Sequence, residues 1–353
     1  MSSKPTGVGF VGLSAKGWGS MALAPSLLDP SLKQNYSIEA LCTTSESSAV
    51  ETAQKYTELT GHPVKPFYGD TSKIANDPAV DLVVVSVKVP YMKKSLMPAI
   101  EAKKDFFVEW PVGMNLQEVT EVAETARSQG VRGIVGMQGR LSPIAKKMKE
   151  IITSGKLGTI RSSAIVRPLC VTLPVVAIGH QLDVLTHLLS DFASLSATAT
   201  IVYPTATVVD DNNQPTGETR TATSPDHIAV TGLLKSGVLT SITWRAGLPS
   251  APGRKHLEWV IEGEDGTLRL EGHDFPQAFL HVGNPELYLN GELVQVGTYP
   301  GPGGNFVGNL VAAWTEFANG GEGNYASIDD GMRIHKLLDA ISRSAAEGRK
   351  IDV

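Results

Sequence analysis

The stretch Val8-Gly9-Phe10-Val11-Gly12-Leu13-Ser14-Ala15-Lys16-Gly17-Trp18 decides the fold of the first part of the chain. Its apolar beginning, Val8 to Val11, predicts a buried strand. The strand runs directly into Gly12-x-Ser14-x-x-Gly17, which is the dinucleotide pattern G-x-G-x-x-G with serine at its second position. Gly12 allows a sharp turn, a small residue at position 14 lets the backbone approach a pyrophosphate, and Gly17 lets the next helix pack closely. The stretch therefore predicts a nucleotide-binding βα unit whose helix N-terminus faces the phosphates.

Other residues of this loop are candidates for cofactor contacts. The Ser14 hydroxyl can donate a hydrogen bond to a phosphate, and Lys16 and Trp18 flank Gly17. Trp18 is either a core aromatic residue or a surface on which part of the cofactor stacks. Glycine-rich βα turns also occur without a ligand, but the strand before the loop and the helix after it favour the nucleotide site.

The residues after the second strand bear on the choice of cofactor. The predicted strand Ser37–Cys42 is followed by Thr43, Thr44 and Ser45. An Asp or Glu at this place would accept hydrogen bonds from the ribose 2′-hydroxyl of NAD. Neutral hydroxyls leave room for a 2′-phosphate and do not repel it, although no arginine follows directly. We therefore expect NADP(H) to bind at least as tightly as NAD(H).

The composition excludes several classes of protein. The chain has 353 residues, enough for two domains, and its net charge of -5 argues against binding to nucleic acid or to an anionic membrane surface. Its two cysteines, Cys42 and Cys170, have neither a disulfide framework nor metal-ligand spacing, so we expect no metal site. No apolar run reaches membrane length, and the N-terminus lacks the apolar core of a signal peptide. We expect a cytoplasmic protein, with the nucleus as the alternative.

Strands and helices alternate through the first 140 residues. Periodicity predicts strands at 8–11, 37–42, 66–68, 80–87, 105–109 and 133–137, and helices at 22–28, 47–59, 91–102 and 116–129. This alternation predicts a doubly wound parallel α/β sheet with right-handed crossovers. We assign residues 1–140 to an NAD(P)-binding Rossmann domain.

The pattern changes after residue 140. Helices are predicted at 142–154, 180–189, 305–319 and 327–347, and strands at 161–168, 194–203, 227–234, 240–244, 257–262, 267–271 and 279–282. Polar loops are predicted at 209–223 and 299–304. We assign residues 141–353 to an α+β domain with a large, mostly antiparallel sheet. Its C-terminal helix either stays in this domain or packs back on the first one.

Several motifs together resemble the glucose-fructose oxidoreductase / inositol dehydrogenase (Gfo/Idh/MocA) family. They are the glycine loop, Phe107-Val108-Glu109-Trp110-Pro111, Gln138-Gly139-Arg140-x-Ser142-Pro143, Gly179-His180 with Asp183, and Asp329-Asp330-Gly331. Lys16-Gly17-Trp18 and Glu109-Trp110 are most similar to the fungal galactose-repressor (Gal80-like) branch. The resemblance implies a two-domain NAD(P)-dependent protein that dimerises through its C-terminal sheet. It implies a small-molecule substrate for an enzyme, or a protein partner for a regulator.

The resemblance also shows which catalytic residues this chain lacks. Active members end the strand with Glu-Lys-Pro, and the lysine handles the proton of the substrate hydroxyl. Position 110 is tryptophan here, and its indole N–H does not exchange a proton near neutral pH. The family's acid four residues before the histidine is replaced by Val176. His180 remains, with Asp183 one helical turn later, and both are catalytic candidates.

Four further candidates follow strand ends, where ligands bind in open α/β sheets. Lys88 is a candidate for cofactor binding and proton transfer, unless it faces solvent. Glu109 either accepts a hydrogen bond from a ribose or pairs with a cation. Arg140 either holds a phosphate or carboxylate or is a surface charge. Trp110 either stacks on the cofactor or lies in the core.

These observations leave three functions open. The one we favour is an atypical NAD(P)-dependent oxidoreductase that acts on a sugar-like compound or a secondary metabolite. The second is a non-catalytic NAD(P)-binding transcription regulator, which the loss of the lysine and the acid supports. The third is an isomerase or lyase that retains the cofactor. The role of His180 separates them, because a regulator does not need an acid–base residue.

Overall fold

The computed structural model describes residues 4–14, 17–168, 174–210, 214–247, 251–301, 303–320 and 323–353. It divides the chain into two compact units, Met1–Pro143 with Thr298–Lys336 and Ile144–Gly297 with Leu337–Val353. Lys16 and Cys170, which the sequence singles out, lie outside the described residues. In these described ranges, no helix is long and apolar enough to cross a membrane.

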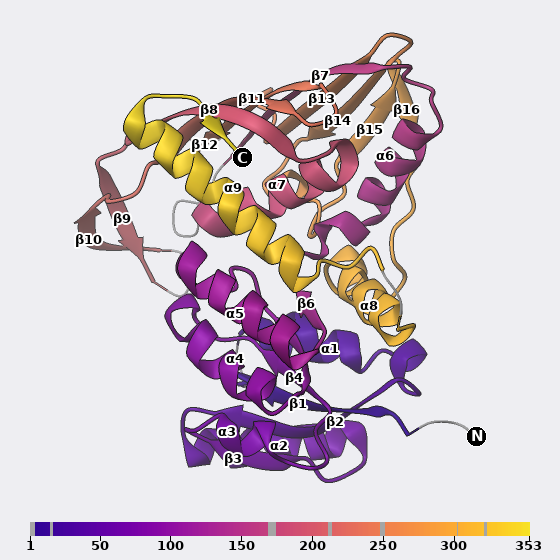
Figure 1. Cartoon of the computed structure of the whole chain (residues 1–353), viewed down its shortest axis with the longest axis vertical. Helices are drawn as coiled ribbons and strands as arrows, with labels where there is room; N and C mark the ends of the chain where they lie inside the picture. The colour runs from indigo at the N-terminus through magenta and orange to yellow at the C-terminus, as the bar shows by residue number, and fades with distance from the viewer. Residues whose placement is uncertain are drawn as a thin grey trace. The chain divides into compact units, whose positions relative to one another are not determined.

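The first unit contains a six-stranded sheet in the order β3-β2-β1-β4-β5-β6 (Figure 1). Its strands are β1 (Thr6–Val11), β2 (Tyr36–Thr43), β3 (Lys65–Tyr68), β4 (Leu82–Val85), β5 (Asp105–Val108) and β6 (Gly133–Val135). Every neighbouring pair is parallel, and the strand order is that of a Rossmann fold. The side chains of β4 are all buried, as expected for a parallel strand covered on both faces. The predicted doubly wound sheet is confirmed.

The helices of this unit are α1 (Ala24–Leu27), α2 (Glu46–Thr60), α3 (Ser72–Ala75), α4 (Met92–Glu101), α5 (Leu116–Gln129) and α8 (Gly304–Ala318), together with the start of α9 (Ile328–Glu347). Capping residues define their ends. Ser45 accepts a hydrogen bond from the backbone N–H of Ser48 at the start of α2. Asn115 does the same for Glu118 at the start of α5. Helix α2 ends at Gly61, whose φ of 76° favours glycine.

Helix α8 belongs to the core of the first unit. Its residues Leu310 and Trp314 are buried in the same hydrophobic core as Phe107. The Tyr36 hydroxyl also donates a hydrogen bond of 2.9 Å to the main-chain oxygen of Trp314. The sequence assigns residues 298–336 to the second domain, whereas the structure counts them with the first unit. Local periodicity shows that α8 has an apolar face, but it does not show which core buries that face.

The second unit contains a nine-stranded sheet in the order β16-β15-β14-β13-β7-β12-β11-β8-β17. Its strands are β7 (Ile160–Pro168), β8 (Phe192–Thr200), β11 (His227–Leu234), β12 (Leu239–Arg245), β13 (Leu257–Gly263), β14 (Thr267–Gly272), β15 (Glu286–Leu289), β16 (Glu292–Val294) and β17 (Ile351–Asp352). Only β7 and β12 pair in parallel among these strands. The predicted large, mostly antiparallel sheet is confirmed.

The two faces of this sheet carry different side chains. Figure 1 shows α6 (Pro143–Thr153) and α7 (Pro174–Leu189) along one face of this sheet. Trp244, Trp259 and Ile242 are buried on the face of Arg167, whose guanidinium donates to residues of α7. The alternate positions point to the opposite face. Leu233 and Leu239 pair there across β11 and β12 and are both exposed. This alternation is the period of two that a sheet covered on one face requires.

Two details of the second unit differ from the sequence-based expectation. The segment 279–282 is wrong as a strand: it forms turns, in which the backbone N–H of Val282 donates to the oxygen of Phe279 at 2.8 Å. The segment 209–223 is wrong as a loop, because β10 (Pro215–Thr221) pairs there with β9 (Thr205–Val209). The side chains of β10 are all exposed, so the hairpin lacks the apolar alternation by which strands are predicted.

Candidate functional site

The glycine loop of the first unit has no room for a side chain at Gly12. A Cβ atom on Gly12 would lie 2.1 Å from the backbone oxygen of Ser86, and its φ is 90°. The backbone N–H of Gly12 donates to the oxygen of Cys42 at 2.9 Å, which ties the loop to β2. Gly17 also has a positive φ, 134°. The chain therefore turns tightly at the end of β1, and the backbone of Ser86 fills the space that a side chain at position 12 would need. A tight glycine turn of this kind is the first part of a pyrophosphate-binding loop.

Two residues of the segment Thr43–Ser45 are exposed, Thr44 and Ser45, and the Ser45 hydroxyl is occupied by the helix cap. The Thr43 hydroxyl donates to the main-chain oxygen of Ser45 at 3.0 Å, and Thr43 is buried. Ser45 caps α2. Thr44 is exposed between them. Of the three residues that the sequence proposes for the cofactor ribose, Thr44 is therefore the one positioned to meet a ligand.

Glu109 lies at the end of β5 in a half-buried position. Its Oε1 accepts a hydrogen bond of 2.5 Å from the indole N–H of Trp18, and its Oε2 accepts one of 3.3 Å from the backbone N–H of Trp110. A Cβ on Gly136 would lie 2.3 Å from Oε2, so a glycine makes space for the carboxyl group. Burial raises the pKa of Glu109 to about 8, against the two hydrogen bonds, which lower it. Among the described residues, no cation pairs with Glu109, and its carboxyl group is mostly protonated at neutral pH.

We expect the raised pKa of Glu109 to make stability depend on pH. The folded protein holds a proton on Glu109 between the ordinary pKa of 4.5 and about 8, so stability falls as pH rises through that window. Thermal unfolding of the wild type and Glu109→Gln should show the wild type losing about 2 kcal/mol relative to the variant between pH 6 and pH 9. The exposed Glu51→Gln is the control. A wild type that gains stability relative to Glu109→Gln on going to pH 9 contradicts the assignment.

Trp110 is a core residue of the first unit. It is 5% exposed, and its ring lies 4.6 Å from that of His335 on α9. Burial lowers the pKa of His335 to about 4, so this imidazole is neutral. Its Nε2 has no hydrogen-bond partner among the described residues. At the position where the family resemblance implies a catalytic lysine, this chain has a buried tryptophan that packs against a buried histidine. The geometry favours the core alternative for Trp110 over stacking on a cofactor.

Arg140 and Lys88 occupy different environments. Arg140 is 5% exposed and forms two contacts of 3.2 Å with the carboxylate of Asp330. This pair lowers the pKa of Asp330 well below its usual range, although burial of the carboxyl group opposes the shift. The geometry gives Arg140 a structural role inside the unit. Lys88 follows β4 and is exposed, which leaves it available to a ligand.

His180 of the second unit lines a cavity of about 270 Å³. It lies on α7, and its ring stacks on that of His281 with centroids 4.0 Å apart. The His180 Nδ1 has no hydrogen-bond partner among the described residues. The rest of the lining is apolar and comprises Val176, Ala177, Phe275, Pro276, Phe279 and Val282. Asp183, one turn later on α7, is fully buried.

Both imidazoles of this cavity are neutral. Burial and the nearby charge of Arg167 lower the pKa of His180 to about 3. Burial, His180 and Arg167 lower the pKa of His281 as well. A neutral imidazole in a concave, apolar pocket is suited to accept a proton or donate a hydrogen bond to one ligand group.

Comparisons with known proteins place the chain in a family. A sequence model described as an oxidoreductase family with an NAD-binding Rossmann fold matches residues 6–137, and one for the C-terminal domain of Gal80p matches residues 169–272. The chain is 32% identical to the dehydrogenase aclE of Aspergillus oryzae, over 98% of each chain. The chain belongs to the Gfo/Idh/MocA oxidoreductase family. The predicted NAD(P)-binding Rossmann domain and the predicted family are confirmed.

Two Gal80 comparisons support the predicted branch of this family. The chain is 29% identical to the galactose/lactose metabolism regulatory protein GAL80 of Saccharomyces cerevisiae, over 82% of this chain and 71% of that protein. The structure of a super-repressor mutant of Gal80p from the same yeast superimposes with a TM-score of 0.86 at 26% identity, covering 99% of this chain and 98% of that chain. An NAD-binding oxidoreductase from Klebsiella pneumoniae shares the fold, with a TM-score of 0.78 at 21% identity over 99% of each chain.

Within this Gfo/Idh/MocA protein, the structure brings the predicted residues together in two groups. Trp18 and Glu109 lie beside the glycine loop in the first unit, and His180 lies at the cavity in the second. Sequence reasoning missed Arg167 and His281, which surround His180. Arg167 could have been found, because it continues the alternation of the buried Ser163 and Ile165 on β7; Arg161 shares this alternation but is exposed.

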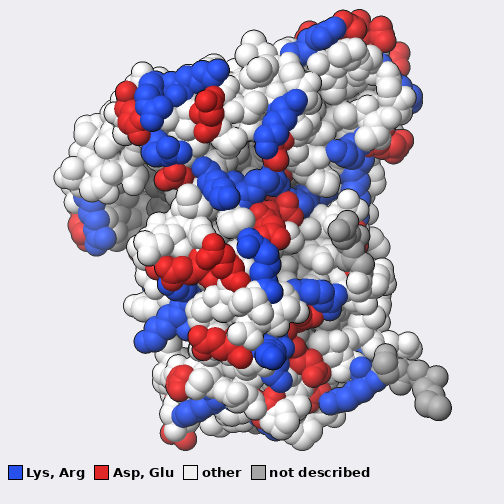
Figure 2. All heavy atoms as spheres, in the orientation of Figure 1, with Lys and Arg blue, Asp and Glu red and all other residues white. Residues whose placement is uncertain are grey.

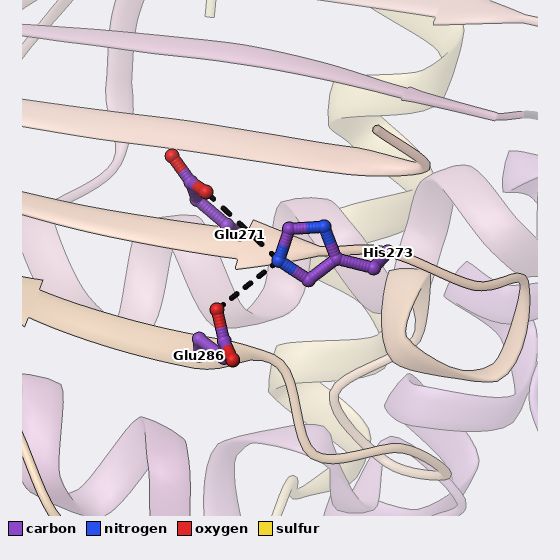
Figure 3. A group of neighbouring side chains, drawn as sticks. All are labelled: Glu271, His273 and Glu286. Carbon is purple, nitrogen blue, oxygen red and sulfur yellow. Dashed lines mark hydrogen bonds and ion pairs between the residues drawn. The ribbon is translucent and has the colours of Figure 1, made fainter. Parts of the chain in front are cut away.

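A second polar cluster joins Glu271, His273 and Glu286 at the sheet edge (Figure 3). Nε2 of His273 lies 3.1 Å from Glu286 and 4.0 Å from Glu271. The buried carboxylate of Glu271 already forms ion pairs with two cations, Lys255 at 2.5 Å and Arg269 at 3.1 Å. The arrangement is an ion-pair network on the surface of the sheet.

Proposed function

We propose that the chain is an oxidoreductase that transfers a hydride between a nicotinamide dinucleotide and a small molecule. The observation that carries this proposal is the unpartnered His180 Nδ1 in the wall of an apolar cavity. The near full-length match to a protein named a dehydrogenase supports it. A regulator that acts through its surface does not need an acid–base residue, whereas an oxidoreductase does.

Several residues of the first unit would hold the cofactor. The backbone from Gly12 to Gly17 would cradle the pyrophosphate, Thr44 would meet the adenosine ribose, and the protonated Glu109 would donate a hydrogen bond. The bound nicotinamide supplies the hydride donor or acceptor.

His180 is the residue we propose for proton transfer. Neutral at pH 7, its imidazole can accept the proton of a substrate hydroxyl as the hydride leaves carbon, and return it in the reverse direction; its pKa of about 3 makes it a weak base for this step. Trp110 cannot share this task, so we expect ordinary sugars and polyols to react slowly. The experiment that tests the function is calorimetry with NADPH and NADH, followed by turnover screening at 340 nm. Absence of binding by both cofactors contradicts the proposal.

A Gal80-like regulator is the second candidate. The match of residues 169–272 to the Gal80p C-terminal domain favours it, as does the buried Trp110. In a regulator, His180→Ala would leave cofactor binding and partner binding unchanged, while surface substitutions would weaken partner binding. Acidic and basic side chains are interspersed over the face in Figure 2, and with the net charge of -5 this argues against direct binding to DNA.

We expect Thr44→Asp to reverse the cofactor preference. A carboxylate beside the ribose repels a 2′-phosphate and accepts hydrogen bonds from a 2′-hydroxyl. Titration of cofactor fluorescence should show NADPH affinity falling at least ~10-fold, with NADH affinity unchanged or higher. Thr44→Asn, nearly the same shape without the charge, should keep the wild-type preference. Equal effects of Asp and Asn would show that Thr44 does not lie near the ribose.

We also propose a homodimer that forms through the exposed face of the large sheet. Leu233 and Leu239 are 44% and 60% exposed there and lie side by side, and a second copy would cover them. Sedimentation should show a dimer at micromolar concentration, and Leu239→Glu should weaken dimerisation at least ~10-fold. Leu59→Glu, at an exposed position on α2 of the first unit, is the matched control. A wild-type monomer at this concentration contradicts the proposal.

A further inference from the structure

Arg167 is a buried cation for which the described residues supply no counter-charge. It is 1% exposed, and its Nη1 donates to Gln181 at 2.9 Å and to the oxygen of Ala177 at 3.4 Å. Its Nε and Nη2 have no hydrogen-bond partner, and no carboxylate lies within 4.0 Å of it, in the part of the chain that the structure describes. A buried guanidinium with unpaired N–H groups is strongly unfavourable unless an anion compensates it.

Arg167 lies directly behind the wall of the His180 cavity. Its Cζ is 4.6 Å from the centroid of the Phe279 ring, and Ala177, to which it donates, is also part of the lining. Its charge acts on both His180 and His281. All of these residues belong to the second unit. The cavity therefore combines an apolar wall, one unpartnered imidazole nitrogen and an uncompensated positive charge.

We propose that this cavity binds a small hydroxy acid with an apolar body, that its hydroxyl group hydrogen-bonds to the unpartnered Nδ1 of His180, and that Arg167 selects its carboxylate by charge. The proposal rests on the proposed function, because it names the class of substrate for the same site. Phe275, Phe279 and Val282 would contact the apolar body. Arg167 is a specificity-determining residue that acts through the low-dielectric wall.

The same lining disfavours polyols. A sugar or inositol carries hydroxyl groups around its whole ring, and the polar side chains among the described lining residues are the two imidazoles. Each hydroxyl buried without a partner costs more than an apolar contact returns. An aromatic or branched hydroxy acid instead places its hydroxyl at the imidazole of His180 and its carbon atoms against the phenylalanines, and its carboxylate meets the charge of Arg167.

The first test compares ligands on the wild-type chain. Calorimetry without cofactor would use benzoate, its neutral isostere benzamide and myo-inositol. We expect benzoate to bind at least ~10-fold more tightly than benzamide and myo-inositol to bind least, because only benzoate meets the charge of Arg167. Benzamide or myo-inositol binding as tightly as benzoate would overturn the proposal. This arm needs no variant, so it holds even if substitutions at Arg167 prevent folding.

The second test removes the charge. Arg167→Met should lose the preference for benzoate over benzamide, whereas Arg167→Lys should retain part of it. Arg161→Met removes an exposed cation from the same strand and should change nothing. A folded Arg167→Met protein with the wild-type preference would overturn the proposal. Titration with NADPH in the same samples distinguishes the oxidoreductase proposal from the cavity proposal. If the protein does not bind NADPH but still prefers benzoate to benzamide, only the oxidoreductase function is contradicted.

Discussion

Gly12→Ala should abolish binding of the nicotinamide dinucleotide and destabilise the first unit. The added Cβ would stand 2.1 Å from the oxygen of Ser86 and 2.9 Å from Val87, in a backbone conformation with φ of 90° that alanine avoids. Displacing the backbone of the β4 end should lower the free energy of unfolding by about 3 kcal/mol. Thermal unfolding and titration with NADPH and NADH measure the two effects.

Gly61→Ala separates the steric clash from backbone strain. Gly61 has a similar φ of 76°, but nothing lies within 4 Å of the position of its Cβ. We expect it to cost about 1 kcal/mol and to leave cofactor binding unchanged. If Gly12→Ala costs no more than Gly61→Ala and still binds cofactor, the loop has room that the structure does not show, and the pyrophosphate site is misplaced.

His180→Ala should remove the chemistry and spare the cofactor. Loss of the acid–base group should lower the rate of hydride transfer about 10²–10⁴-fold, because the lysine that assists it in relatives is replaced by the buried Trp110. NADPH affinity should stay within about twofold, since no residue of the glycine loop belongs to the unit of His180.

His187→Ala is the control on the same helix. It lies two turns after His180 on α7, outside the cavity lining. Its rate should match the wild type within about twofold. A parallel loss of rate in both variants would indicate damage to α7 rather than loss of a proton acceptor. An unchanged rate in His180→Ala would assign the proton to another group.

The parallel sheet of the first unit and the helices between its strands could be predicted from the sequence. Their signals are local: Gly12 and Gly17 at fixed spacing, the β-branched run of β4, and the residues that cap α2 and α5. In the second unit, the hairpin of β9 and β10 was not predicted, because the side chains of β10 are exposed on both faces and show no apolar period. The assignment of α8 to the first unit was not predicted, because its apolar face packs on the core around Phe107, about 200 residues away in the chain.

The candidate site was predicted less completely, for a related physical reason. His180 and Glu109 follow from motifs, but their protonation states do not, because these depend on burial. The stacking of His180 on His281 joins residues from distant parts of the chain. The core position of Trp110 against His335 has the same origin. The sequence indicates only that Arg167 takes an inward position on its strand. That no described carboxylate pairs with it can be seen only in the folded unit.

The most direct test of the proposed function is single-turnover hydride transfer by the wild-type protein. The protein, in excess over NADP⁺, would be mixed with mandelate, an aromatic hydroxy acid, or with myo-inositol or sorbitol, and absorbance followed at 340 nm. The account predicts that mandelate reduces NADP⁺ at least about 100-fold faster than either polyol, because the polyols have no carboxylate to meet the charge of Arg167 and bury several hydroxyl groups against an apolar lining. Rapid reduction with myo-inositol or sorbitol, and none with mandelate, would contradict it.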